Sequence, residues 1–159
     1  MDVKIEKIKK EDKIILERML QLYLHDISSY FYIDFDSKTG LYKYDELDKY
    51  FDESENFAYF IKNNDAILGF SLVDIFQNEN VIQEIFILNN YKGQSVGTMA
   101  AELIFEENKG NWVVRALPKS EKAEKFWYKS INQYTNNSFK IEHVGKYNRA
   151  IFTFNNENK

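Results

Sequence analysis

The sequence predicts a single domain of mixed α/β class, spanning residues 1–159, with about seven strands and four helices. Three observations support this prediction. Runs of β-branched and aromatic residues alternate along the chain with segments whose apolar residues recur at helical spacing. The chain has no internal repeat and no linker, and it contains only 6 Gly and 1 Pro. Its 159 residues, of which 44% are hydrophobic and 29% charged, suit one globular domain with a substantial core.

The first third of the chain predicts a strand, a long helix, an irregular loop and a short helix. Residues 3–8 place apolar residues among charges in the manner of a strand, and residues 13–29 carry apolar residues at helical spacing, so one face of that helix is expected to be buried. Residues 30–44 mix aromatic and acidic residues without a clear period, which predicts a loop. Residues 45–51 predict a short helix whose acids favour its N-terminus.

The remaining two thirds predict strands and helices in alternation. Residues 56–62 and 66–73, separated by an Asn-Asn-Asp turn, predict an antiparallel hairpin. Further strands are expected at 81–88, 111–117, 139–143 and 149–154, and further helices at 98–105 and 120–129. Ser120 is the expected N-cap of the last helix, and residues 155–159 are expected to be frayed.

Charge and composition argue against several classes of function. The net charge is −4, so no basic surface is expected for nucleic acid or anionic lipid. The absence of cysteine excludes a disulfide, a thiolate metal site and a cysteine nucleophile. No apolar run reaches membrane-spanning length, and the charged, alternating N-terminus is unlike a signal peptide. We therefore expect a cytoplasmic protein with neither a nucleic-acid nor a membrane partner.

Residues 81–107 form the stretch around which the chain is organised. A run of β-formers, VIQEIFIL, is followed by a short loop with two glycines and then by a helix. This geometry directs free backbone N–H groups and a helix N-terminus at one point, and such a point attracts phosphate. The nucleotide-triphosphatase loop G-x-x-x-x-G-K-S/T and the dinucleotide loop G-x-G-x-x-G are both absent.

The loop sequence YKGQSVG at 91–97 resembles the Q/R-x-x-G-x-G/A loop of the GCN5-related N-acetyltransferases, the GNAT family. Gly97 matches the family pattern outright. Lys92 stands where Arg or Gln is usual, and Ser95 stands where the first motif glycine is usual. The Ser95 hydroxyl is expected either to cap the following helix or to donate to a phosphate oxygen.

The second resemblance lies at 120–129, which is similar to the family's N-x-x-A-x-x-F-Y helix. Ser120 takes the Asn position, Ala123 and Phe126 match, and Trp127 replaces the tyrosine. Strand, loop, helix, strand and helix thus follow the family's order over about half of the chain, most closely as in a bacterial subgroup of acetyltransferases. The resemblance implies a mostly antiparallel sheet with helices on both faces.

The resemblance also implies an N-acetyltransferase that moves the acetyl group of acetyl-CoA, as co-substrate, to a primary amine by direct attack in a ternary complex. Many relatives are dimers, which leaves a homodimer open. The residues that would contact the co-substrate come from the strand, the loop and the last helix: Phe86, Ile87, Leu88, Lys92, Gly93, Gln94, Ser95, Val96, Gly97, Thr98, Ser120, Phe126 and Trp127.

Two residues are candidates for proton transfer. Glu84 lies in an otherwise apolar strand just before the expected pantetheine contacts, where burial would raise its pKa toward that of a useful base. A structural ion pair or a solvent-facing edge position are the alternatives for Glu84. Indole cannot act as an acid in place of the family's tyrosine, so Tyr128 is the candidate acid. Another tyrosine, or departure of the thiolate unaided, are the alternatives for Tyr128.

The loop at 30–44 is the candidate acceptor site. Tyr30 and Tyr32 with Asp34 would suit a cationic amine through cation–π contact and charge. Alternatively, these rings cap the hydrophobic core. A rival function is a catalytically weak or inactive acyl-CoA-binding domain that serves regulation or interaction, and the missing motif tyrosine favours that rival.

Overall fold

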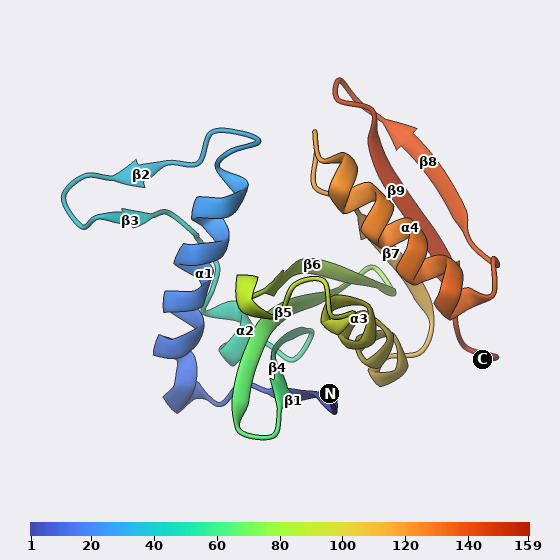
Figure 1. Cartoon of the computed structure of the whole chain (residues 1–159), viewed down its shortest axis with the longest axis horizontal. Helices are drawn as coiled ribbons and strands as arrows, with labels where there is room; N and C mark the ends of the chain where they lie inside the picture. Colours follow the sequence, from blue (N-terminus) through green and yellow to red (C-terminus); the bar gives the residue numbers. More distant parts are fainter.

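A seven-stranded sheet with strand order β1-β4-β5-β6-β7-β9-β8 forms the centre of the computed structural model, which describes residues 1–159 (Figure 1). Its strands are β1 (Val3–Lys7), β4 (Asn56–Asn63), β5 (Ala66–Phe76), β6 (Glu79–Ile87), β7 (Asn111–Arg115), β8 (Lys140–Val144) and β9 (Arg149–Asn155). All neighbouring strands are antiparallel except β6 and β7, which are parallel. The mixed α/β class and the mostly antiparallel sheet are confirmed.

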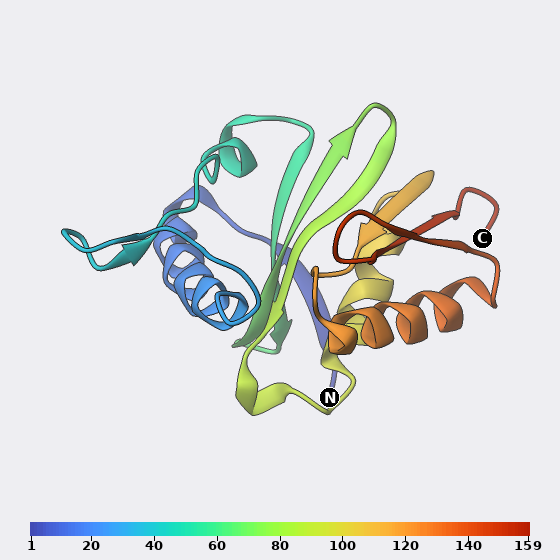
Figure 2. The same cartoon turned by 90° about the horizontal axis from the view of Figure 1, so that it is seen from above.

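Helices cover both faces of the sheet, as expected (Figure 2). The helices are α1 (Lys13–Ile27), α2 (Lys49–Asp52), α3 (Val96–Glu107) and α4 (Glu121–Thr135). Helices α1 and α2 lie on one face, which we call the α1 face, and α3 and α4 lie on the other, the α3 face. None of the helices has the length and apolarity that a membrane crossing requires.

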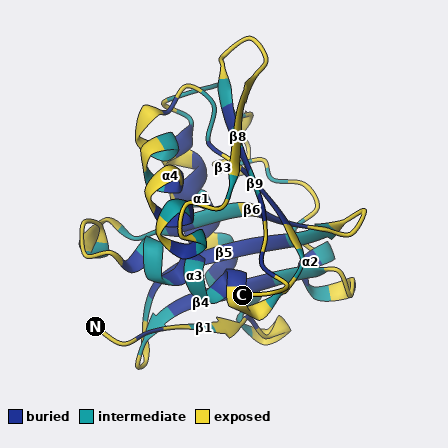
Figure 3. Cartoon of the chain, turned by 90° about the vertical axis from the view of Figure 1, so that its right-hand side faces the viewer, coloured by how far each residue is buried: buried dark blue, intermediate teal, exposed yellow.

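Each face has its own hydrophobic core, and buried residues concentrate between the helices and the central strands (Figure 3). On the α1 face, Leu16 and Leu20 of α1 pack on Phe70 and Leu72 of β5. On the α3 face, the ring centroid of Phe105 lies 4.9 Å from that of Trp112 and 5.0 Å from that of Phe154. These cores derive from the periodic apolar stripes of the sequence.

Some elements differ from the sequence predictions. The loop at 30–44 contains a small hairpin, β2 (Phe35–Asp36) and β3 (Leu41–Tyr42), which stands away from the sheet (Figure 1). Helix α4 runs longer than expected, to Thr135, and ends where Asn136 adopts a left-handed conformation with φ 50°. Asn156 is not frayed: its side chain is buried and donates hydrogen bonds to the Phe105 carbonyl at 2.7 Å and to the Tyr134 hydroxyl at 3.0 Å.

A β-bulge at Gln83 decides which residues of β6 face which helices. Ile82 pairs with Val73 and Glu84 pairs with Leu72, so Gln83 has no partner on β5. Val73 belongs to the core of the α3 face, and Leu72 belongs to that of the α1 face. The extra residue therefore sends Ile82 to the α3 face and Glu84 to the α1 face.

Candidate active site

The sheet opens between its two parallel strands. β6 and β7 pair only from Glu79 to Val81 and from Asn111 to Val113. Beyond these residues β6 continues to Ile87 without β7 beside it. The opening lies between α1 on one face and α3 with α4 on the other (Figure 2).

The opening leaves backbone groups of β6 without a strand partner. The Leu88 N–H donates to the Leu68 carbonyl at 2.8 Å, so Leu88 turns its backbone groups toward β5. In an antiparallel ladder this direction alternates, and the groups of Ile85 and Ile87 therefore point away from β5, toward the opening. A bound extended chain could pair with them as an additional strand.

The loop between β6 and α3 presents a second set of free backbone donors. The N–H groups of residues 93–98 make no hydrogen bond of good geometry, because they precede or belong to the first turn of α3. Gly93 has φ +77° and Ser95 has φ 62°, and these two left-handed residues bend the loop around the start of the helix. Free amides and the positive end of a helix dipole favour an anion such as phosphate.

Three side chains of the loop differ in the contacts that they make. Ser95 is the N-cap residue of α3 by position, but its side chain makes no capping hydrogen bond, so the capping expectation was wrong. The Lys92 ammonium lies 3.7 Å from Asp26 of α1 and 5.9 Å from the centre of the Phe86 ring. Lys92 therefore leans toward α1. Gln94 donates to the Asn90 carbonyl at 3.1 Å and closes the loop on itself.

Contacts with α4 fix the start of α3. A Cβ atom at Gly97 would lie 3.0 Å from the Phe126 ring, so any side chain here would require that ring to move. Thr98 and Ser130 share a hydrogen bond of 3.1 Å between their hydroxyls. Ser120 caps α4, as predicted, by accepting from the Ala123 N–H at 3.1 Å. Residues of α4, which carries the second motif, thus pack against the loop and the start of α3, which carry the first motif.

Glu84 is the centre of a partly buried polar cluster on the α1 face. Its carboxylate accepts hydrogen bonds from the hydroxyl of Tyr23 on α1 and, at 3.3 Å, from that of Tyr44. Burial raises the pKa of Glu84 to about 7, although these two hydrogen bonds oppose the change. The pKa values of Tyr23 and Tyr44 are themselves raised, first by burial and then by the charge of Glu84. A carboxylate that titrates near neutrality at the opening of the sheet can act as a general base.

Arg149 is a third member of this region. Its Nε donates to the Ala116 carbonyl at 2.7 Å, and its charge opposes the rise in the pKa of Glu84. Burial and the neighbouring Arg115 lower the pKa of Arg149 itself. Neither Arg149 nor the two tyrosines were predicted as site residues, because Tyr23 belongs to the apolar stripe of α1 and the other residues follow no motif.

The structure does not bring Tyr128 to this region. Phe126 contacts Gly97 at the start of α3, and two further residues turn Tyr128 about 200° round the helix. Its ring packs edge-on against Phe139, with centroids 5.5 Å apart, and is half exposed. Trp127 is buried in the core of the α3 face. The acid expected on α4 is therefore not supported by the position of either residue.

The proposed acceptor residues of the 30–44 loop are mostly exposed. Tyr32 is 86% exposed, and its hydroxyl is 3.5 Å from Asp34. Asp34 is already paired with Lys43 at 2.8 Å. Tyr30 is partly buried at the end of α1. The loop contributes Tyr44, not these residues, to the cluster around Glu84.

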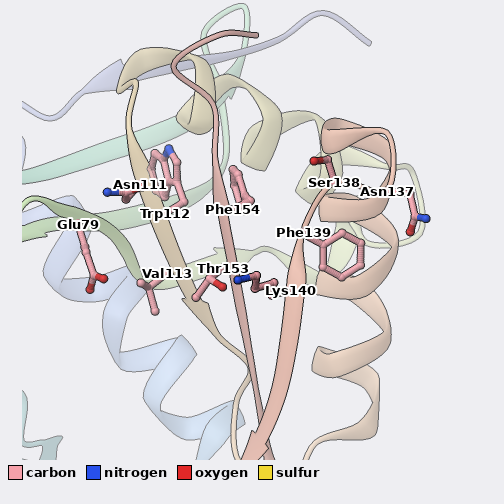
Figure 4. A pocket seen from close by; sticks show the side chains of 10 residues that line it. All are labelled: Glu79, Asn111, Trp112, Val113, Asn137, Ser138, Phe139, Lys140, Thr153 and Phe154. Carbon is pink, nitrogen blue, oxygen red and sulfur yellow. The ribbon is translucent and has the colours of Figure 1, made fainter.

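A surface hollow of about 440 Å³ lies elsewhere on the sheet (Figure 4). Its lining includes Glu79, Asn111 and Val113, at the end where β6 and β7 are still paired. A second hollow of about 440 Å³ lies on the α1 face beside the bulge, and Asp74, Gln83 and Arg115 contribute to its lining. The lining of the second hollow includes Gln83, the residue before Glu84, whereas Glu79 is the only residue of β6 in the lining of the first.

The strand order, the parting of the parallel strands and the loop before α3 define the fold of the GNAT acetyltransferases. Solved structures with this fold cover nearly the whole chain at low sequence identity. An acetyltransferase of the GNAT family from Staphylococcus aureus Mu50 matches at a TM-score of 0.60 with 15% identity, over 97% of this chain and 99% of that one. No family model and no curated protein matches the sequence.

Two further structures contain ligands. Spermidine N-acetyltransferase from Vibrio cholerae, in complex with CoA and spermine, matches at a TM-score of 0.63 with 13% identity, over 96% of this chain and 95% of that one. The aminoglycoside acetyltransferase AAC(6')-Ib, in complex with ribostamycin and coenzyme A, matches at 0.67 with 10% identity, over 99% and 95% of the two chains. The likeness establishes the fold of this chain.

Proposed function

We propose that the protein is an acetyl-CoA-dependent N-acetyltransferase acting on a primary amine in a ternary complex. The observation that carries the proposal is the coincidence of three features at one opening: free loop amides, free strand backbone groups and a carboxylate whose pKa is about 7. The structures with CoA and an amine bound on the same fold support it. A domain that only bound proteins would not require a carboxylate with a pKa near 7 at this opening.

The residues present suit coenzyme A. The N–H groups of residues 93–98 would hold its pyrophosphate, and the backbone of Ile85 and Ile87 would hold its pantetheine arm. Bound acetyl-CoA would supply the acetyl group as a thioester. Phe126, whose ring packs on Gly97, would border the loop that holds the pyrophosphate.

Glu84 would take the proton that the attacking amine must lose. Hydrogen bonds from Tyr23 and Tyr44 fix the direction of its carboxylate, and its pKa of about 7 leaves a large fraction ionised at neutral pH. The deprotonated amine then takes the acetyl group directly, so no covalent intermediate on the protein is needed. We assign no general acid, since Trp127 stands at the motif position and the coenzyme A thiolate is a fair leaving group.

Calorimetric titration with acetyl-CoA and with coenzyme A tests the phosphate loop. Ser95→Asp would place a negative charge among the loop amides, whereas Ser95→Asn, of equal size and equally tolerant of a left-handed backbone, would not. We expect binding by wild type and Ser95→Asn, and a loss of about 10-fold or more in Ser95→Asp. Gly97→Trp, which would collide with Phe126, should abolish binding. Absence of binding by wild type would refute the proposal.

The rival is a domain that binds acyl-CoA without catalysis, which the indole at Trp127 and the strained Ser95 favour. Release of free thiol from acetyl-CoA in the presence of a panel of amines separates the two functions. Turnover that is lost in Glu84→Gln supports the transferase. Tight binding of acetyl-CoA with no turnover of any amine would instead support the binding domain without catalysis.

A further inference from the structure

The three arginines of the chain, Arg18, Arg115 and Arg149, all lack an ion-pair partner. Arg18 is exposed on α1, where water satisfies it. Arg149 is different because it is partly buried beside the Glu84 cluster. Its only hydrogen bond runs from Nε to the Ala116 carbonyl, which leaves both terminal nitrogens without a protein acceptor. A guanidinium partly removed from water without an acceptor is unfavourable unless a ligand supplies one.

The sheet places Arg149 and Arg115 on the same face as Glu84. Arg115 pairs with Ile151, so Arg149, two residues before Ile151, is its diagonal neighbour on the same side of the sheet. Val113, two residues before Arg115, pairs with Val81, and Val81 pairs with Asp74, whose carboxylate meets Lys49 on the α1 face. Both guanidinium groups therefore flank the opening on the α1 face, across from Glu84. Arg115 and Gln83, the residue before Glu84, both line the second hollow.

Several acidic residues of this face are neutralised by lysines of the protein. Asp34 pairs with Lys43 at 2.8 Å, Asp74 pairs with Lys49 at 3.2 Å, and Asp48 pairs with a lysine of α1. Glu53 and Glu55, which also line the second hollow, are exposed and make no ion pair. Among the charged side chains that act on Glu84 itself, Arg149 has the largest effect. A polyamine would have to place several positive charges beside the arginines, which is unfavourable.

We propose that the acceptor is a primary amine that also carries an acidic group, with its amine at Glu84 and its carboxylate or phosphate at Arg149. The inference rests on the proposed function and specifies its substrate class. Arginine suits this role because its planar fork binds carboxylate and phosphate through two parallel hydrogen bonds. The bond from Nε to Ala116 fixes the plane of the guanidinium and so favours one direction of approach. Arg115 adds a second positive charge at the same place.

Matched pairs of amines test the proposal. Phenylalanine and phenethylamine, lysine and cadaverine, and glucosamine 6-phosphate and glucosamine differ within each pair by the acidic group alone. The rate of thiol release from acetyl-CoA gives kcat/KM for each amine. We expect wild type to favour the acid-bearing member of at least one pair by about 10- to 100-fold. The pair that shows the preference distinguishes a carboxylate from a phosphate.

Variants assign the preference to Arg149. Arg149→Met keeps much of the apolar stem of the side chain but not the charge, and it should abolish the preference. The preference is measured as the ratio of kcat/KM between the two members of a pair, because loss of this charge also raises the pKa of Glu84 and changes the rate for both members. Arg149→Lys, which keeps the charge but not the fork, should retain part of it. Arg18→Met is the matched control and should behave as wild type. Thermal melting by circular dichroism shows whether each variant is folded.

The outcomes separate this inference from the function on which it rests. Efficient acetylation of the neutral amines, with no preference or with a preference that persists in folded Arg149→Met, would overturn the inference and leave the transferase intact. If no amine turns over, titration of the same pairs into protein loaded with coenzyme A gives a second measure. Binding of acid-bearing amines that is lost in Arg149→Met supports the inference, and binding of none of them overturns it.

Discussion

Replacing Glu84 by glutamine should make the protein more stable at alkaline pH and much less active. Burial moves the pKa of this carboxyl from 4.5 to about 7. Each unit of pKa is worth about 1.4 kcal/mol, so ionised Glu84 destabilises the folded state by about 3 kcal/mol. Glutamine has the same shape, carries no charge and can still accept a hydrogen bond from a tyrosine hydroxyl. The variant is therefore freed from that penalty.

The sign follows from proton binding in the two states. Between pH 4.5 and about 7 the folded protein holds a proton on Glu84 that the unfolded chain has lost, so this residue's contribution to the free energy of unfolding falls as pH rises through the window. Glu84→Gln has no such titration. The difference between the two proteins should be small at pH 4.5 and reach about 3 kcal/mol above pH 8, or about 6–12 °C in melting temperature.

Urea denaturation of wild type and Glu84→Gln from pH 4.5 to 8.5 measures this difference. Glu79→Gln is the control, because Glu79 lies exposed on the same strand and its replacement should give a curve parallel to that of wild type. The loss of the base should lower kcat by about 10²- to 10⁴-fold. A stability difference that does not change with pH, or a Glu84→Gln protein less stable than wild type at pH 8, would refute the reasoning.

The remaining predictions concern the loop, the tyrosine cluster and the bulge. Ser95→Gly should raise the free energy of unfolding by about 1 kcal/mol, because glycine adopts the φ of 62° without strain, and urea denaturation checks it. Tyr23→Phe removes a hydrogen bond that lowers the pKa of Glu84, so the pH at half-maximal kcat/KM should rise by about one unit. Deletion of Gln83 should abolish acetyl transfer, because the residues on one side of the deletion would then point to the opposite face of the sheet. Gln83→Ala keeps the bulge and should remain active, and the rate of thiol release from acetyl-CoA measures both variants.

Local signals in the sequence predicted the scaffold of the site well. The strand, the loop and the helix of residues 81–107 follow from β-formers, glycines and helical periodicity over adjacent residues. The cap at Ser120 also depends only on neighbours in sequence, and its hydrogen bond to Ala123 is present at 3.1 Å. Gly97 lies where α4 packs closely against α3, and a side chain there would have to displace the Phe126 ring.

The chemistry around Glu84 could not be predicted in the same way. Tyr23 is 61 residues and Tyr44 is 40 residues away from Glu84 in sequence, so only the docking of α1 and of the following loop brings them together. Tyr128 was the candidate acid because it is the tyrosine next to the motif position, but helical geometry places it against Phe139. The face that a helix turns toward a cleft depends on tertiary packing. The local sequence pattern alone does not specify it.

The bulge at Gln83 determines how the proposed base and the free backbone groups of β6 are placed. Strict alternation along β6 would place Ile82 and Glu84 on the same face, and the carboxyl would then enter the apolar core beneath α3. Because Gln83 is unpaired, Ile82 packs in that core, while Glu84 lies on the α1 face, where it accepts hydrogen bonds from Tyr23 and Tyr44. It also sets the phase of the residues that follow, so that the backbone groups of Ile85 and Ile87 face the opening. The base and the free strand backbone are thus brought to one opening by a single irregularity, and a bulge is a means by which a sheet can redirect a side chain toward a functional site.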